Sequence, residues 1–158
     1  MKTAINTRFF STLLLAGIFI SACSKEQGSL PGSNLYTLSG DANGGQVVPA
    51  VSSGGAATIS GTYNPTSRLL NYTTGWNGLS GAPIAAGFYA GPAGANGMIS
   101  GMPWTLSDGS TATGKLSGSI YLTPEQAAEL TSGGWYYSIG TNNFPNGEIR
   151  GQITAIQP

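Results

Sequence analysis

The chain has 158 residues, with six basic and six acidic side chains, one cysteine and no histidine. Without histidine it contains no Ser-His-Asp triad, no Cys-His pair and no imidazole metal site, and a lone cysteine makes no intrachain disulfide. It also has no basic stripe, which argues against nucleic-acid binding. The 25 glycines and the low charge favour short strands and tight turns within one domain.

The first 22 residues have the features of a secretory signal. Lys2 and Arg8 precede an apolar run over residues 9–20, which ends in the small residues Ser21 and Ala22. A basic start, a short apolar stretch and small residues at a cut are typical of export signals. The run is shorter than the roughly 20 apolar residues that a spanning helix needs. We therefore predict a signal peptide over residues 1–22 and an exported protein.

Cys23 follows this signal directly. Residues 20–23, Ile-Ser-Ala-Cys, resemble a bacterial lipobox. The resemblance implies that Cys23 takes a diacylglyceryl group, and that fatty acids such as palmitate hold the lipoprotein on the cell envelope. Two or more acyl chains anchor a protein stably, whereas one chain binds only marginally. The alternative is an unmodified thiol beside an ordinary cleavage site.

Residues 23–34 are small and polar, with Pro31 and two glycines. This composition is typical of a flexible tether. Residues 23–26, Cys-Ser-Lys-Glu, resemble the start of surface-exported bacterial lipoproteins. The resemblance implies anchoring at the outer membrane, with the protein in the periplasm or on the surface. The alternative is a solvated tether with two incidental charges.

Apolar and polar residues alternate with period two in residues 57–63, 115–122 and 148–155. This alternation is the pattern of half-buried strands. Further candidate strands lie at residues 68–76, 82–90, 104–106 and 135–141. Turn signals such as Asn64-Pro65 separate them. Many short strands at such spacing predict an all-β fold, an antiparallel sandwich or barrel.

The last alternating segment carries two charged residues, Glu148 and Arg150. The alternation places Ile149 and Ile153 towards the core, and Arg150 with Gln152 towards solvent. Glu148 and Arg150 are predicted to share the outer face, where they pair with each other or with a neighbouring strand. The functional alternative is a recognition patch for an anionic partner, with Arg150 as a bidentate fork.

One short helix is predicted near residues 124–131. Thr123 is the expected N-cap, Pro124 occupies the first helical position, and Gln126 completes a capping box. Gly133 and Gly134 are expected to end it. The helix thus connects two strands.

The closing residues carry a family likeness. Residues 122–126, 130–137 and above all 144–153, Phe-Pro-Asn-Gly-Glu-Ile-Arg-Gly-Gln-Ile, resemble the chordin-type (CHRD) domain. The likeness extends upstream to residues 38–40, 46–49, 79–83 and 91–97. The closing motif contributes these residues, for which we expect a structural role: Pro145, Gly147, Glu148, Arg150, Gly151 and Gln152.

The resemblance implies a CHRD domain over residues 35–156. It implies an immunoglobulin-like or superoxide-dismutase-like β-sandwich and an extracellular module, as in the secreted growth-factor antagonist chordin. Many family members have a His-x-His where this chain has Gly87-Phe88-Tyr89, and a further histidine where it has Gly140. Three such imidazoles are plausible metal ligands. Their absence here predicts that this chain uses no metal or other cofactor.

Few carboxylates are available for acid/base chemistry. Outside the tether and the helix, only Asp41, Asp108 and Glu148 remain for a carboxylate-based hydrolase. Residues 40–45, with one carboxylate, predict a turn rather than a calcium loop, since calcium usually takes several carboxylates. Residues 91–97 are glycine-rich but lack the Lys-Ser/Thr of a phosphate-binding loop.

Several aromatic residues allow two interpretations. As exposed rings they would form a sugar-stacking surface, and as buried rings they would belong to the core or cover a sheet edge. The candidates for the surface are Trp76, Tyr89, Trp104, Trp135 and Tyr136. Trp135 and Tyr137 share one strand face and Tyr136 points to the other, so one set is expected to lie on an edge or be exposed.

The sequence therefore predicts a lipid-anchored, non-catalytic CHRD-type β-sandwich outside the cytoplasm, with a structural or binding role. Its expected contacts are the membrane, through the lipid on Cys23, and a protein or glycan ligand of unknown identity. A carbohydrate-binding or adhesion lipoprotein is the main alternative, and a carboxylate-based hydrolase is the third.

Overall fold

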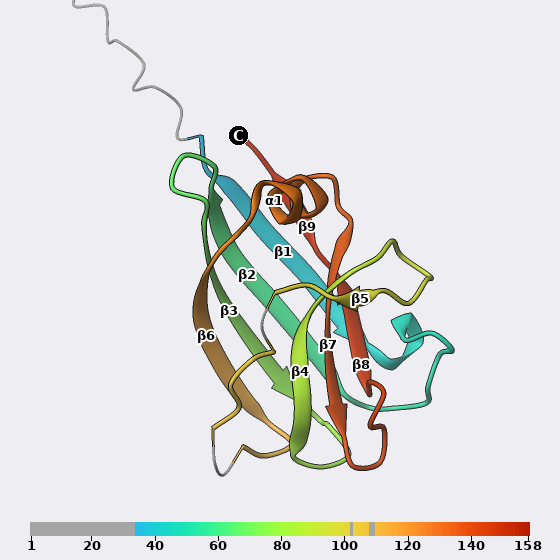
Figure 1. Cartoon of the computed structure of the whole chain (residues 1–158). Coiled ribbons are helices and arrows are strands. Elements are labelled where there is room, and N and C mark those ends of the chain that lie inside the picture. The colour runs from blue at the N-terminus through green and yellow to red at the C-terminus, as the bar shows by residue number, and fades with distance from the viewer. Residues whose placement is uncertain (1–33, 102, 108–109) are drawn as a thin grey trace, which may run out of the picture. The chain divides into compact units, whose positions relative to one another are not determined.

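The computed structural model describes residues 34–101, 103–107 and 110–158. This part of the chain consists almost entirely of antiparallel strands, with one short α-helix (Figure 1). The predicted signal peptide over residues 1–22, the lipidation site Cys23, all of the tether except Asn34, and the candidate carboxylate Asp108 lie outside the described residues.

Nine strands are present in the described residues. They are β1 (Tyr36–Asn43), β2 (Ala56–Asn64), β3 (Leu69–Asn77), β4 (Pro83–Ala90), β5 (Met98–Ile99), β6 (Gly114–Tyr121), β7 (Trp135–Thr141), β8 (Ile149–Gln152) and β9 (Thr154–Ile156). The helices are the 3-10 turn η1 (Gly44–Gln46) and α1 (Pro124–Thr131). The strands form one sheet in the order β5-β4-β7-β8-β1-β2-β3-β6, and β9 also pairs with β1.

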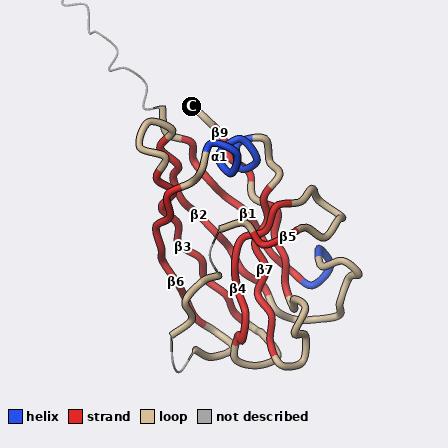
Figure 2. The backbone as a smooth tube through the Cα atoms, viewed as in Figure 1, coloured by secondary structure: helices blue, strands red, loops and turns tan. Residues whose placement is uncertain are grey.

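The sheet curls on itself (Figure 2). Strands β3 and β4 are distant in the sheet order, yet Tyr72 of β3 meets Phe88 of β4 edge to face, with ring centroids 4.8 Å apart. Trp104 stacks on Tyr72 at 5.4 Å and closes the same cluster. The all-β, antiparallel prediction with one short helix is thereby confirmed, in the form of a curled sheet consistent with a sandwich.

The period-two pattern of the sequence explains how the core forms. In β2, the buried residues Ala57, Ile59 and Tyr63 alternate with exposed Thr58 and Ser60. Strand β7 differs, because its residues are buried on both faces except for the half-buried Ser138. The largest fully buried apolar side chains are Trp135, Tyr137, Phe88, Leu38, Leu70, Leu130, Ile139, Ile149 and Ile153.

The predicted helix and its cap are confirmed. The Thr123 hydroxyl accepts a hydrogen bond from the Gln126 N–H, and the Gln126 side chain accepts one from the Thr123 N–H. The helix ends at Thr131, and Gly133 takes a φ of +78°, a left-handed conformation that glycine adopts without strain. Leu130 is fully buried and fixes α1 to the core.

Replacing Thr123 with alanine is expected to lower the free energy of unfolding by about 1 kcal/mol, since it removes the oxygen that caps the first turn. Chemical denaturation followed by circular dichroism measures this loss. Thr123→Ser keeps the hydroxyl and serves as the control, so an equal loss in both variants would contradict the capping role.

Three local expectations were wrong. Residues 148–155 form two strands rather than one, because the Ile153 N–H still donates to Trp135 of β7 while the next residues pair with β1. Residues 104–106 form no strand, and Trp104 makes a single backbone hydrogen bond to Ala86. Residues 40–45 are not a simple turn, since β1 continues to Asn43.

Candidate functional site

Glu148 is fully buried at the end of the core and receives four hydrogen bonds. The hydroxyls of Ser53, Ser80 and Thr141 donate to its carboxylate at 2.6, 2.7 and 2.6 Å, and the Ser80 N–H donates at 2.7 Å. Ser53 precedes β2, Ser80 lies between β3 and β4, and Thr141 ends β7. The carboxylate therefore joins three segments that are distant in the sequence.

Within the described ranges, hydrogen bonds rather than a cation stabilise the charge of Glu148. Burial raises the pKa of this carboxyl, but the hydrogen bonds from Ser53, Thr141 and Ser80 lower it, and together they hold the pKa below its ordinary value. These hydrogen bonds fix the ionised carboxylate in place between the three segments.

Arg150 is also buried, with 3% of its surface exposed. Its guanidinium carbon lies 3.7 Å from the centre of the Tyr136 ring, a cation–π contact. Nη2 donates to the Pro92 carbonyl at 2.8 Å and to the Gln152 side chain at 3.3 Å. Nη1 is buried and has no hydrogen-bond partner among the described residues.

The predicted exposed pairing of Glu148 and Arg150 is wrong. Strand β8 begins at Ile149, so Glu148 precedes the ladder and reaches Thr141, on the inner face of β7. Arg150 lies against Tyr136, on the opposite face of β7. The two charges thus lie on different sides of the sheet, and the loop at Pro92 covers Arg150.

The other residues of the closing motif form the turn before β8 and hold neighbouring loops against this strand. Gly147 has a φ of +126°, which side chains rarely tolerate, and the turn before it carries the exposed Pro145. The amide of Gln152 donates to the carbonyls of Gly91 and Gly133 at 3.0 and 2.8 Å. The closing motif therefore connects β8 to the surrounding loops.

Gly151→Ala is expected to destabilise the domain by about 1 to 3 kcal/mol through overpacking. An added Cβ would lie 2.7 Å from the Asp41 carbonyl oxygen and 2.7 Å from the Tyr137 ring. Thermal unfolding measures the loss. Gly81→Ala is the matched control, because an added Cβ there meets nothing within 4 Å. Equal stability of the two variants would contradict the close packing of β8 on β1.

The aromatic candidates do not form an exposed stacking surface. Trp76, Trp104, Trp135 and Tyr136 are buried, with at most 6% of each exposed. Trp104 and Trp135 pack on Phe88, and Tyr136 is covered by Arg150 and stacked on Tyr89 at 5.2 Å. Only Tyr89 is partly exposed. The core interpretation is therefore correct for Trp76, Trp104 and Trp135, whereas Tyr136 is buried on the other face of β7, beneath Arg150.

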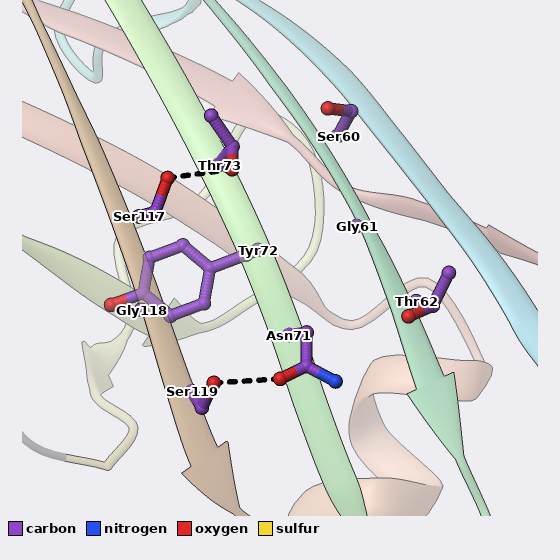
Figure 3. Close-up of a pocket in the computed structure, with 9 residues that line it drawn as sticks. All are labelled: Ser60, Gly61, Thr62, Asn71, Tyr72, Thr73, Ser117, Gly118 and Ser119. Atoms are coloured by element: carbon purple, nitrogen blue, oxygen red, sulfur yellow. Dashed lines mark hydrogen bonds between the residues drawn. The ribbon is translucent and has the colours of Figure 1, made fainter.

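The alternating hydroxyls instead form a polar surface on the outside of β2, β3 and β6 (Figure 3). We call it the hydroxyl face, and its polar side chains are Ser60, Thr62, Asn71, Thr73, Ser117 and Ser119. They form two rows across the strands, Ser60–Thr73–Ser117 and Thr62–Asn71–Ser119. The hydroxyls of Thr73 and Ser117 are hydrogen-bonded at 2.8 Å, and the Ser119 hydroxyl donates to the Asn71 side chain at 2.6 Å. A shallow depression of about 630 Å³ lies over them.

The hydroxyl face was not among the predicted sites, although serine and threonine recur at every second position of its strands. Hydroxyl and amide side chains both donate and accept hydrogen bonds, as sugar hydroxyls require. The hydroxyl face is therefore a candidate binding surface.

Gly87, Tyr89 and Gly140, the positions for which the resemblance implied histidines in other sequences, lie on one side of the sheet. Gly87 and Tyr89 share a face of β4, and their partners in β7 are Ser138 and Tyr136, on the face that also carries Gly140. Arg150, paired with Ser138, lies on this side as well. In the described part of the chain, no group of His, Cys, Asp or Glu side chains is arranged to hold a metal.

A family model for the CHRD domain matches residues 38–153. The chain belongs to the CHRD domain family. The match covers the described sheet from β1 to the end of β8, including Glu148 and Arg150. No curated protein and no solved structure matches the chain.

CHRD domains are extracellular or secreted, so membership supports an extracytoplasmic module with a structural or binding role. Within the described ranges, no helix has the length and apolar character needed to cross a membrane. Glu148 and Arg150, the two charged residues of the closing motif, lie inside the domain rather than on its surface.

Proposed function

We propose that this protein is a lipid-anchored CHRD module of the bacterial cell envelope, held by acyl chains on Cys23 and exposed in the periplasm or on the cell surface at the outer membrane. The observation that carries the proposal is the sequence arrangement: a lipobox-like segment, a short tether and then one CHRD domain. We expect the module to have either a structural role or a role in binding a ligand.

A non-enzymatic role is part of this proposal. Both oxygens of Glu148 accept hydrogen bonds within the domain, so this carboxylate is poorly placed to exchange protons with a substrate. Asp41 is exposed on β1, and the chain has no histidine to pair with it. Measured turnover of a glycoside that is lost in Asp41→Asn would contradict this part.

Protease treatment of intact cells tests the location. A surface-exposed module is expected to be digested in intact cells, and a periplasmic one only after the outer membrane is permeabilised. Protection that persists until the inner membrane is broken would contradict the proposal. A periplasmic binding protein and a cytoplasmic enzyme of the same cells are the controls for membrane integrity.

Glycan binding at the hydroxyl face is the second candidate function. The two cross-strand rows of hydroxyl and amide groups favour it, since no charged side chain is among the residues that line the depression over them. Binding to a glycan array that is lost in Asn71→Leu with Thr73→Val would support it. The matched substitutions Asn142→Leu with Thr111→Val, at exposed loop positions outside the hydroxyl face, are expected to leave that binding intact. Equal binding by all variants would contradict this candidate.

A further inference from the structure

Arg150 is a buried cation without a counter-ion in the described part of the chain. Its bonded partners are neutral: the Pro92 carbonyl, the Gln152 amide and the Tyr136 ring. The carboxylate of Glu148 is held by hydroxyls on the other side of the sheet. An unpaired buried charge is strongly unfavourable, so a folded domain keeps one only where something else compensates for it.

Arg150 is among the residues that line a pocket of about 360 Å³. Tyr136, Ser138 and Arg150 of β7 and β8 line it, and residues 47–49 and Asn96 form part of its wall. The Asn96 side chain donates to the Val48 carbonyl at 2.7 Å and so closes part of the rim. Asn96 is exposed, so this hydrogen bond can open without disturbing the core.

The polar groups of the pocket suit a small anion with hydroxyl groups. Arg150 carries one positive charge, and its Nη1 has no hydrogen-bond partner in the described part of the chain. A single positive charge suits one carboxylate better than a dianion. The Tyr136 hydroxyl accepts a hydrogen bond from the Gly97 N–H, so its own O–H can donate a hydrogen bond to a ligand. The Ser138 hydroxyl donates to the Ile149 carbonyl and keeps lone pairs to accept.

We propose that this pocket, which we call the Arg150 pocket, binds a small hydroxylated carboxylate of the kind found in acidic sugars. The carboxylate contacts Nη1 after Asn96 releases the rim, and the sugar hydroxyls bond to the hydroxyl and amide groups of the wall. The inference rests on the proposed binding role of the module and names the ligand class for one site, separate from the hydroxyl face.

The proposal is tested by NMR of the mature protein, labelled with ¹⁵N and purified in mild detergent, in which Arg68 serves as an internal control for Arg150. After Cys23 the chain has two arginines, Arg68 and Arg150, so two Nε–Hε signals are expected, and Arg68→Lys assigns them. Titration with D-glucuronate is expected to shift the Arg150 signal in a saturable manner, with a Kd on the order of 1 mM. The signal of the exposed Arg68 is expected to stay in place. Glucuronate should also raise the Tm, because it binds only the folded state.

D-Glucose, the neutral counterpart, is expected to shift neither signal. Arg150→Lys keeps the charge but loses the planar fork, so calorimetry should show binding weakened about tenfold or more. Arg68→Lys is the matched control and should bind as the unsubstituted protein does. If Arg150→Lys fails to fold, the glucuronate and glucose titrations of the unsubstituted protein still decide the matter.

Three results would overturn the proposal: equal shifts with glucose, movement of both arginine signals together, or no saturable shift up to about 100 mM glucuronate. Acetate that binds as tightly as glucuronate would contradict the sugar-acid class. If glucuronate does not bind a protein whose N-terminus is acylated, the proposal for the Arg150 pocket is wrong, and the proposal of a lipid-anchored module stands. If glucuronate binds a protein that carries no acyl chain, the pocket proposal stands and the proposal of lipid anchoring is wrong.

Discussion

Glu148→Leu is expected to lower the free energy of unfolding by about 3 kcal/mol or more, enough to unfold a marginal domain. The substitution leaves the Ser80 N–H and the hydroxyls of Ser53, Ser80 and Thr141 without their shared acceptor inside the protein. Glu148→Gln keeps the shape and one acceptor oxygen, so a smaller loss is expected. Urea denaturation measures both values.

The same carboxylate predicts how stability depends on pH. Because the folded domain holds the pKa of Glu148 below its ordinary value, the ionised form stabilises the fold. This stabilisation is complete above the unfolded pKa of about 4.3 and is lost as the pH falls through the lower folded pKa. The stability advantage of the unsubstituted protein over Glu148→Gln should therefore be constant near pH 7 and shrink in acid.

Asp41→Asn is the matched control, because Asp41 is an exposed carboxylate on β1. It should unfold at nearly the same urea concentration as the unsubstituted protein. A Glu148→Leu domain with unchanged stability would show that the four hydrogen bonds contribute little and that the motif is retained for another reason.

Cys23→Ser is expected to move the protein out of the membrane fraction or to block its processing. Serine offers no thiol for the thioether bond, so the acyl chains that anchor the protein are missing. The apolar run of residues 9–20 is too short for a stable span on its own. Fractionation followed by immunoblotting measures the shift, and an anchored chain that depends on Cys23 should change from mostly membrane-bound to mostly soluble or unprocessed.

Ser24→Ala is the control for this experiment, since it changes the neighbouring residue and keeps the thiol. It should leave the membrane fraction unchanged. Retention of fully processed Cys23→Ser protein in the membrane fraction, resistant to salt and alkaline washes, would show that another segment anchors the chain.

The architecture was predictable because alternation is a local property of the sequence. Residues 57–63 and 115–122 alternate and lie in β2 and β6, and the Thr123 capping box begins α1 where expected. The closing motif identified the family before its geometry was known. These features depend on residues close together in the chain, or on one short motif.

The environments of Glu148 and Arg150 were not predictable in the same way. Alternation assigns a side chain to a face of a strand, and it does not say which loop covers that face. Pro92, about sixty residues upstream, covers Arg150, and Ser53 and Ser80 reach Glu148 from two other loops. Alternation put Tyr136 on the face opposite Trp135 and Tyr137 and predicted that one of the two sets is exposed or on an edge. Both sets are buried, because Arg150 and Tyr89 lie over Tyr136.

The N-terminus of the mature protein tests the central claim most directly. Mass spectrometry of the protein purified from membranes is expected to show a chain that begins at Cys23 and carries a diacylglyceryl group with further fatty acid. The CHRD domain would then lie outside the cytoplasm on a tether of residues 23–34. An unmodified Cys23, or a chain that begins at another residue, would contradict the account of a lipid-anchored module.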